Sequence, residues 1–262
     1  MIEFLLAACL LMLVLIVGVL YSIQDRIQKK LRDFEARIMR DPAQLRRPHT
    51  SSLMALYRIM DGKDWLPIIR GAEISPDLLL HIVLHIQREA PRTIIECGCG
   101  TSTVVIASAL EKIGGGGHIY SIEEHPQLAE ETSYELKRRG LDRLATIINA
   151  PLTERNYPEY DATFHWYDLQ GAALPPQADM LLVAGPRTRV GKFTFYPAGP
   201  ELMPKLAPGA HIFVVDADHP DHRQLRVQWR TLYPDLGVRE IPAERGAFEM
   251  YFLDDKMRQF TR

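Results

Sequence analysis

Hydrophobic and polar positions follow three different patterns along the chain. Residues 4–23, FLLAACLLMLVLIVGVLYSI, carry no charge. Residues 24 to about 47 are rich in charges and place Ile27, Leu31, Phe34 and Ile38 at helical spacing. Beyond residue 70, short apolar runs alternate with longer stretches of helical periodicity. The pattern predicts a transmembrane helix over 1–23, a basic juxtamembrane helix and linker over 24–70, and a folded domain over 71–262.

The uncharged segment has the length of a membrane anchor, because twenty helical residues rise about 30 Å, the thickness of a bilayer core. A cleaved signal peptide is disfavoured by the acidic start Met1-Ile2-Glu3 and by the absence of a suitable cleavage site. A lipobox ending at Cys9 comes too early, and a buried core helix would have to be apolar all round. Residues 24–70 then hold 11 Lys or Arg against six acids. The positive-inside rule therefore predicts a single-pass membrane protein whose domain faces the cytoplasm.

The rest of the chain alternates strand-like and helix-like segments. Strands are expected at 93–96, 118–122, 145–148, 180–183, 211–215, 238–241 and 248–253, and helices at 76–90, 102–112, 126–139, 198–206 and 221–233. Such alternation predicts an α/β domain with a mostly parallel, doubly wound sheet. Ligands of these sheets bind outside the carboxyl ends of the strands.

A glycine turn follows the first expected strand, in Glu96-Cys97-Gly98-Cys99-Gly100-Thr101-Ser102. Gly98 and Gly100 permit a tight turn and a close approach of ligand to backbone. Glu123 ends the second strand, where a carboxylate can accept hydrogen bonds from both hydroxyls of a ribose. Together these features predict a site for a nucleoside cofactor. Cys97 and Cys99 have no second cysteine pair to complete a zinc site, so they are interpreted as packing residues of the turn.

The cofactor is expected to be S-adenosyl-L-methionine (SAM) and not NAD. A NAD fingerprint has a third glycine where this chain has Thr103. A carboxylate at Glu96 suits a cationic ligand, such as the amino group and sulfonium of SAM.

These residues resemble those of class I SAM-dependent methyltransferases, in which a segment E-x-G-S/C-G-x-S-T follows the first strand. The resemblance runs from about Ile74 to Leu253 and includes TIIECGCGTSTVVIASAL, IYSIEEHPQLAEET, ADMLLVAGP and VVDADHPDH. It implies a Rossmann-like sheet of seven strands with the last strand antiparallel. It also implies SAM contacts at Glu96, Gly98, Gly100, Ser102 and Glu123, and adenine contacts near Asn149 and Ala150.

One position departs from the family pattern. Relatives usually read V-D-G-P after the fourth strand, whereas this chain reads Val183-Ala184-Gly185-Pro186. The missing carboxylate would face the methyl group, and it would hold a divalent ion in metal-using relatives. The change puts catalytic competence and metal use in question.

Candidate catalytic residues follow the fifth strand, in Asp216-Ala217-Asp218-His219-Pro220-Asp221-His222. Three interpretations remain open. Asp218 and Asp221 would cap the next helix; the group would supply a general base; or it would bind a metal. We assign catalysis to Asp216, Asp218 and His219, with Asp216 first because it ends the strand, and we assign no metal site.

The function predicted from the sequence is therefore methyl transfer at a membrane. The acceptor would be an oxygen or nitrogen atom, on a lipid- or glycan-linked molecule. The alternatives are a non-catalytic scaffold at the membrane and a metal-dependent enzyme of the same fold. A net charge of −2 argues against nucleic-acid binding. Trp166, Tyr167 and Tyr196 either line a substrate cleft or belong to the core, and a homo-oligomer remains open.

Overall fold

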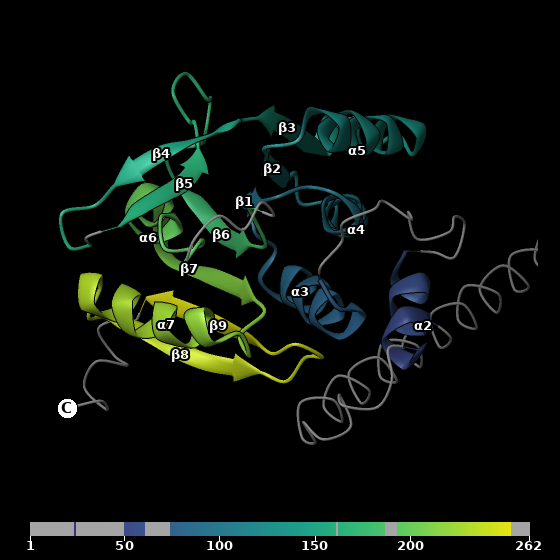
Figure 1. Cartoon of the computed structure of the whole chain (residues 1–262). Coiled ribbons are helices and arrows are strands. Elements are labelled where there is room, and N and C mark those ends of the chain that lie inside the picture. The colour runs from purple at the N-terminus through teal and green to yellow at the C-terminus, as the bar shows by residue number, and fades with distance from the viewer. Residues whose placement is uncertain (1–23, 25–49, 61–73, 161, 187–192, 253–262) are drawn as a thin grey trace, which may run out of the picture. The chain divides into compact units, whose positions relative to one another are not determined.

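The computed structural model describes residues 24, 50–60, 74–160, 162–186 and 193–252 (Figure 1). The predicted membrane span over 1–23 lies outside these residues, as does the predicted helix over 24–47 apart from Gln24. Among the described residues, no helix combines the length and the apolar character that crossing a bilayer requires. The chain divides into two compact units, and the second, Pro48–Arg262, contains the sheet.

A seven-stranded sheet forms the centre of the second unit, which confirms the predicted architecture. Its order is β3-β2-β1-β6-β7-β9-β8. The strands are β1 (Thr93–Cys97), β2 (His118–Glu123), β3 (Ala145–Asn149), β6 (Ala178–Val183), β7 (Leu206–Val215), β8 (Leu236–Ile241) and β9 (Ala247–Phe252). The first five of these pair in parallel, while β9 is antiparallel to both of its neighbours. The central strands β1, β6 and β7 are apolar runs because both of their faces are buried.

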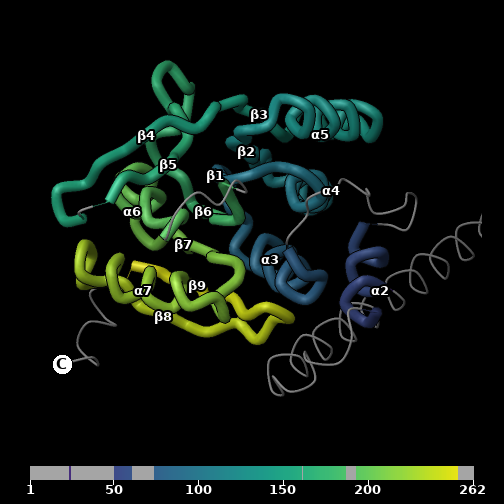
Figure 2. Tube along the Cα trace, in the orientation of Figure 1, coloured from purple at the N-terminus to yellow at the C-terminus, as the bar shows by residue number. Residues whose placement is uncertain are grey.

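Helices cover both faces of the sheet, as Figure 1 and the tube in Figure 2 show. One group is α3 (Pro76–Glu89), α4 (Thr101–Ile113) and α5 (Pro126–Arg138); α3 contacts α4, and α4 contacts α5. On the other face, α6 (Ala198–Leu202) contacts α7 (Pro220–Leu232). Pro76, Pro126 and Pro220 each occupy the first turn of their helix, where the missing N–H costs nothing.

Three local features differ from the sequence prediction. Residues expected to form the linker include α2 (Thr50–Ile59), whose buried Leu56 belongs to the core of the unit, and α2 contacts α3. An antiparallel hairpin of β4 (Leu152–Asn156) and β5 (Thr163–Tyr167) follows β3. The helix expected over 198–206 ends at Leu202, and a 3₁₀ turn over Met203–Lys205 leads directly into β7.

Candidate functional site

The turn after β1 has the conformation that its glycines predict. Gly98 has φ +90° and Gly100 has φ +138°, both in the region that side chains disfavour. The N–H of Gly98 donates to the carbonyl of Ile122 at 2.7 Å, which ties the turn to β2. The turn then enters α4, and it lies at the carboxyl end of the parallel strands, where this fold binds ligands.

Glu96 organises the turn from inside the protein. Its side chain is fully buried. Its carboxylate accepts hydrogen bonds from the hydroxyls of Ser102 at 2.5 Å, Thr103 at 2.7 Å and Ser121 at 2.7 Å. These contacts join β1 to the start of α4 and to β2. The cofactor contacts predicted for Glu96 and Ser102 remain predictions, because in this structure the two side chains form a hydrogen bond with each other.

Glu123 lies beside the glycine turn. Its Oε2 accepts a hydrogen bond from the N–H of Cys99, and its Oε1 accepts one from the N–H of His125, both at 2.9 Å. The N–H of Ala150 donates to the carbonyl of Glu123 at 2.8 Å, which brings the end of β3 to the same place. Ala150 is buried, whereas Asn149 is exposed. The structure thus gathers the acid, the turn and the predicted adenine segment at one edge.

The two cysteines of the turn are buried thiols. Burial raises the pKa of both Cys97 and Cys99 above the usual thiol value. Cys99 Sγ lies 3.2 Å from the hydroxyl of Thr132 on α5. The thiolate is the form that binds metals and attacks electrophiles, so these side chains act as packing residues.

The position of the missing carboxylate lies next to the turn. The N–H of Ala184 donates to the carbonyl of Cys97 at 3.2 Å. The next residue, Gly185, is tightly enclosed: an added Cβ would lie 2.5 Å from Tyr167 Oη and 3.1 Å from the nitrogen of Gly98. The segment after β6 therefore approaches the glycine turn closely. The contact with Tyr167 could not be predicted from the sequence, where only the Gly185-Pro186 pair marks a turn after the strand.

The three candidate catalytic residues are held in different ways. Asp216 is buried with φ +57°, and its Oδ1 forms an ion pair with Arg245 Nε at 2.9 Å. Asp218 is exposed, 3.8 Å from a guanidinium nitrogen of Arg223. His219 is the N-cap of α7, accepting a hydrogen bond on Nδ1 from the N–H of Asp221 at 3.3 Å.

These contacts limit the chemistry of the segment. The expectation that Asp218 caps the helix is wrong, because His219 does so; Asp221 lies in the first turn of the helix. Two strand spacings, roughly 10 Å, separate the end of β7 from the end of β1, so Asp216 lies at the active edge but away from the glycine turn. Its ion pair with Arg245 engages the Oδ1 oxygen of the carboxylate.

The aromatic residues considered for a substrate cleft belong to the core. Trp166 and Tyr167 are fully buried, and Tyr196 is 1% exposed. The Tyr196 ring packs against Tyr157 and Tyr160, and its hydroxyl donates to Glu159 at 2.8 Å. The cluster fixes the β4–β5 hairpin against the segment before α6.

Comparison with known proteins agrees with this fold. Residues 95–217, which run from β1 to just beyond β7, match a family model described as a methyltransferase domain. Two crystal structures share the fold: an O-methyltransferase from Bacillus cereus in complex with SAH, at TM-score 0.51 and 14% identity, and an SAH-bound methyltransferase from Podospora anserina, at 0.53 and 13%. Each likeness covers 78% of this chain, and 91% and 88% of the respective structures.

A curated relative adds sequence similarity over a shorter stretch. A protein-L-isoaspartate O-methyltransferase from Ignicoccus hospitalis is 31% identical over 84 residues, which are 32% of this chain and 39% of that protein. The chain thus has the Rossmann-like sheet that the sequence predicted, and its segment 95–217 is similar to methyltransferase domains.

Proposed function

We propose that this protein is a SAM-dependent methyltransferase that acts on an oxygen or nitrogen acceptor. The observation that carries the proposal is the contact between Glu123 and the glycine turn through the N–H of Cys99. An acidic side chain beside a glycine-rich turn suits the ribose of a nucleoside cofactor. The methyltransferase match over residues 95–217 and the SAH-bound structures of the same fold support SAM as the cofactor.

The residues of the edge fit this cofactor. Each oxygen of Glu123 accepts one backbone N–H, which holds the carboxylate beside the glycine turn, where a ribose would lie in this fold. The carboxylate is fully buried, so a cofactor reaches it only when the segments that cover it open. When bound, SAM supplies an electrophilic methyl group. The chain's own contribution is orientation of the acceptor, and Asp216 is the candidate proton acceptor.

Cofactor binding tests the proposal. Titration of the full-length protein in detergent with SAM and with SAH should give saturable heat. Glu123→Gln should weaken binding about 100-fold, because bonds to a charged acceptor contribute about 1.5–3 kcal/mol each. Glu130→Gln removes the same charge from an exposed site on α5 and should leave affinity unchanged. Folded protein that gives no heat with either compound would overturn the proposal.

A non-catalytic scaffold is the second candidate, and Ala184 favours it, together with the ion pair that occupies Asp216. Incubation with labelled SAM and membrane extracts separates the two functions. Transfer of label by the natural chain excludes the scaffold. Transfer that begins only after Ala184→Asp would instead identify a degenerate enzyme.

We further propose that residues 4–23 anchor the protein in a membrane with residues 24–262 on the cytoplasmic side. The uncharged segment and the basic residues that follow it support this arrangement. The protein should stay in the membrane pellet after an alkaline carbonate wash. Protease should digest the domain in inverted vesicles and spare it in intact cells. Complete extraction by carbonate, or digestion in intact cells, would contradict the anchor or its orientation.

A further inference from the structure

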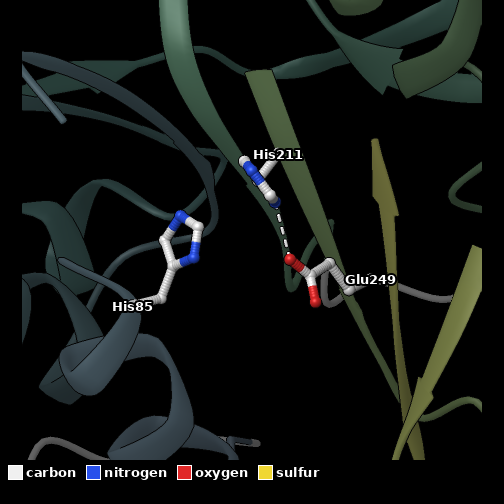
Figure 3. A group of neighbouring side chains, drawn as sticks. All are labelled: His85, His211 and Glu249. Carbon is white, nitrogen blue, oxygen red and sulfur yellow. Dashed lines mark hydrogen bonds and ion pairs between the residues drawn. The ribbon is translucent and has the colours of Figure 1, made fainter. Parts of the chain in front are cut away.

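Three potential metal ligands meet between α3 and the sheet, away from the glycine turn. They are His85 of α3, His211 of β7 and Glu249 of β9, called here the His85–His211–Glu249 group (Figure 3). One ligand atom from each lies within 4.8 Å of the others. His211 Nδ1 is 2.6 Å from Glu249 Oε1, and the rings of His85 and His211 have centroids 4.5 Å apart.

The group is separate from the cofactor site. Strand pairing aligns His211 with Met180 on β6, and Met180 neighbours Ile94 near the start of β1. The glycine turn begins four residues after Ile94, which is about 13 Å along a strand. An ion bound by this group would therefore lie away from the glycine turn.

Access and burial both suit a bound ion. Glu249 is fully buried and His85 nearly so, while 28% of the His211 side chain is exposed. Two ligands are thus held rigidly by the core, and the third leaves a route for an ion and for a water ligand. Three elements far apart in the sequence supply the three side chains, so an ion here would cross-link them.

We propose that the His85–His211–Glu249 group binds a first-row divalent cation, with Zn²⁺ the best fit, as a clamp between α3 and the β7–β9 pair. Two imidazoles and one carboxylate form a donor set that Zn²⁺ accepts, with a fourth position left for water. The ion takes the place of the hydrogen bond between His211 and Glu249, and His211 binds it through the Nδ1 lone pair of the neutral tautomer that carries its proton on Nε2. Small side-chain movements bring the three atoms to the short distances that zinc requires.

Two arginines set the strength of the site. Arg239 Nε donates to Glu249 Oε2 at 2.9 Å, which orients the carboxylate and leaves Oε1 toward His211. Arg88 Nη2 donates to His85 Nδ1 at 3.3 Å, so its positive charge lies next to a ligand and opposes the cation. Arg88 is half exposed, so its removal should not disturb the core.

Zinc titration of the untagged full-length protein, treated with a chelator and kept in detergent, tests the proposal. We expect one Zn²⁺ per chain in competition with a chromophoric chelator, and a rise of about 5–10 °C in melting temperature at 100 times Kd. His211→Gln and His85→Gln should each weaken binding at least about 100-fold, since even outer partners of a metal are worth 10–100-fold. Circular dichroism of the metal-free variants should match that of the natural chain, which would show that a loss of zinc binding is not a loss of folding.

Two further variants make the result specific. Arg88→Gln should tighten zinc binding several-fold, an outcome that loss of structure cannot produce. Glu123, Glu124 and His125 form a second group of potential metal ligands. His125→Gln removes one ligand of that group and should leave the affinity for zinc unchanged. Absence of zinc binding by the natural chain would overturn the proposal, as would binding that survives His211→Gln and is lost with His125→Gln.

Discussion

Replacing Glu96 with leucine should lower the free energy of unfolding by about 3–6 kcal/mol, because the hydroxyls of Ser102, Thr103 and Ser121 would lose their acceptor inside the protein. Each buried polar group without a partner costs about 1–3 kcal/mol. Leucine fills a similar volume, so the loss reports hydrogen bonding and not a cavity. The same change frees the start of α4 and should also remove cofactor binding.

Urea unfolding, followed by the fluorescence of the buried Trp166 and Trp229, measures this effect. Glu96→Gln keeps one acceptor oxygen, and the hydroxyls can rotate toward its amide, so a smaller loss of about 1–2 kcal/mol is expected. Ser121→Ala removes one donor and leaves two, and should also cost about 1 kcal/mol. Equal stability of the leucine variant and the natural chain would refute the internal role of Glu96.

Replacing Gly185 with alanine should destabilise the domain by about 1–3 kcal/mol, the usual cost of overpacking. The new methyl group would lie 2.5 Å from Tyr167 Oη, and backbone atoms of Gly98 and Cys97 stand at 3.1 and 3.2 Å. The buried tyrosine cannot swing aside, so the strain passes to the glycine turn. Affinity for SAM should fall together with stability.

A double variant identifies the source of the strain. Tyr167→Phe deletes the oxygen closest to the new methyl group, so it should recover part of the stability lost in Gly185→Ala. Gly115→Ala is the matched control, since an added Cβ there comes no nearer than 3.8 Å to the atoms around it. Differential scanning calorimetry measures all four proteins. If Gly185→Ala were as stable as Gly115→Ala, the space around Gly185 would accommodate a methyl group, and the prediction would be wrong.

The sheet could be predicted from the sequence because each central strand is an apolar run bounded by glycine, proline or polar residues. The glycine turn and Glu123 were also predictable, since the fold brings the ends of neighbouring parallel strands together whatever the distant contacts are. The β4–β5 hairpin was missed for the opposite reason. Glu154 and Arg155 interrupt the apolar pattern of its first strand. Its aromatic residues are explained by packing against Tyr196, which is distant in the sequence.

Residues whose roles depend on distant partners could not be inferred from local pattern. Asp216 was expected to be an available base, but Arg245, 29 positions later in the β8–β9 turn, pairs with it. His81 and His85 are spaced by one helical turn on α3, a signal of a shared face. Their partners could not be predicted from this spacing, because His211 and Glu249 are more than 100 residues away along the chain.

The position of β9 has a consequence for synthesis of the protein. This strand, the last one described along the chain, lies between β7 and β8 and supplies the described pairing of β8. As the ribosome releases the chain from its amino end, β7 emerges with an open flank that stays open until residues 247–252 appear. A nascent chain shorter than this exposes an unpaired apolar strand and is a target for chaperones. Closure of the sheet is therefore a late event, after translation of nearly the whole domain.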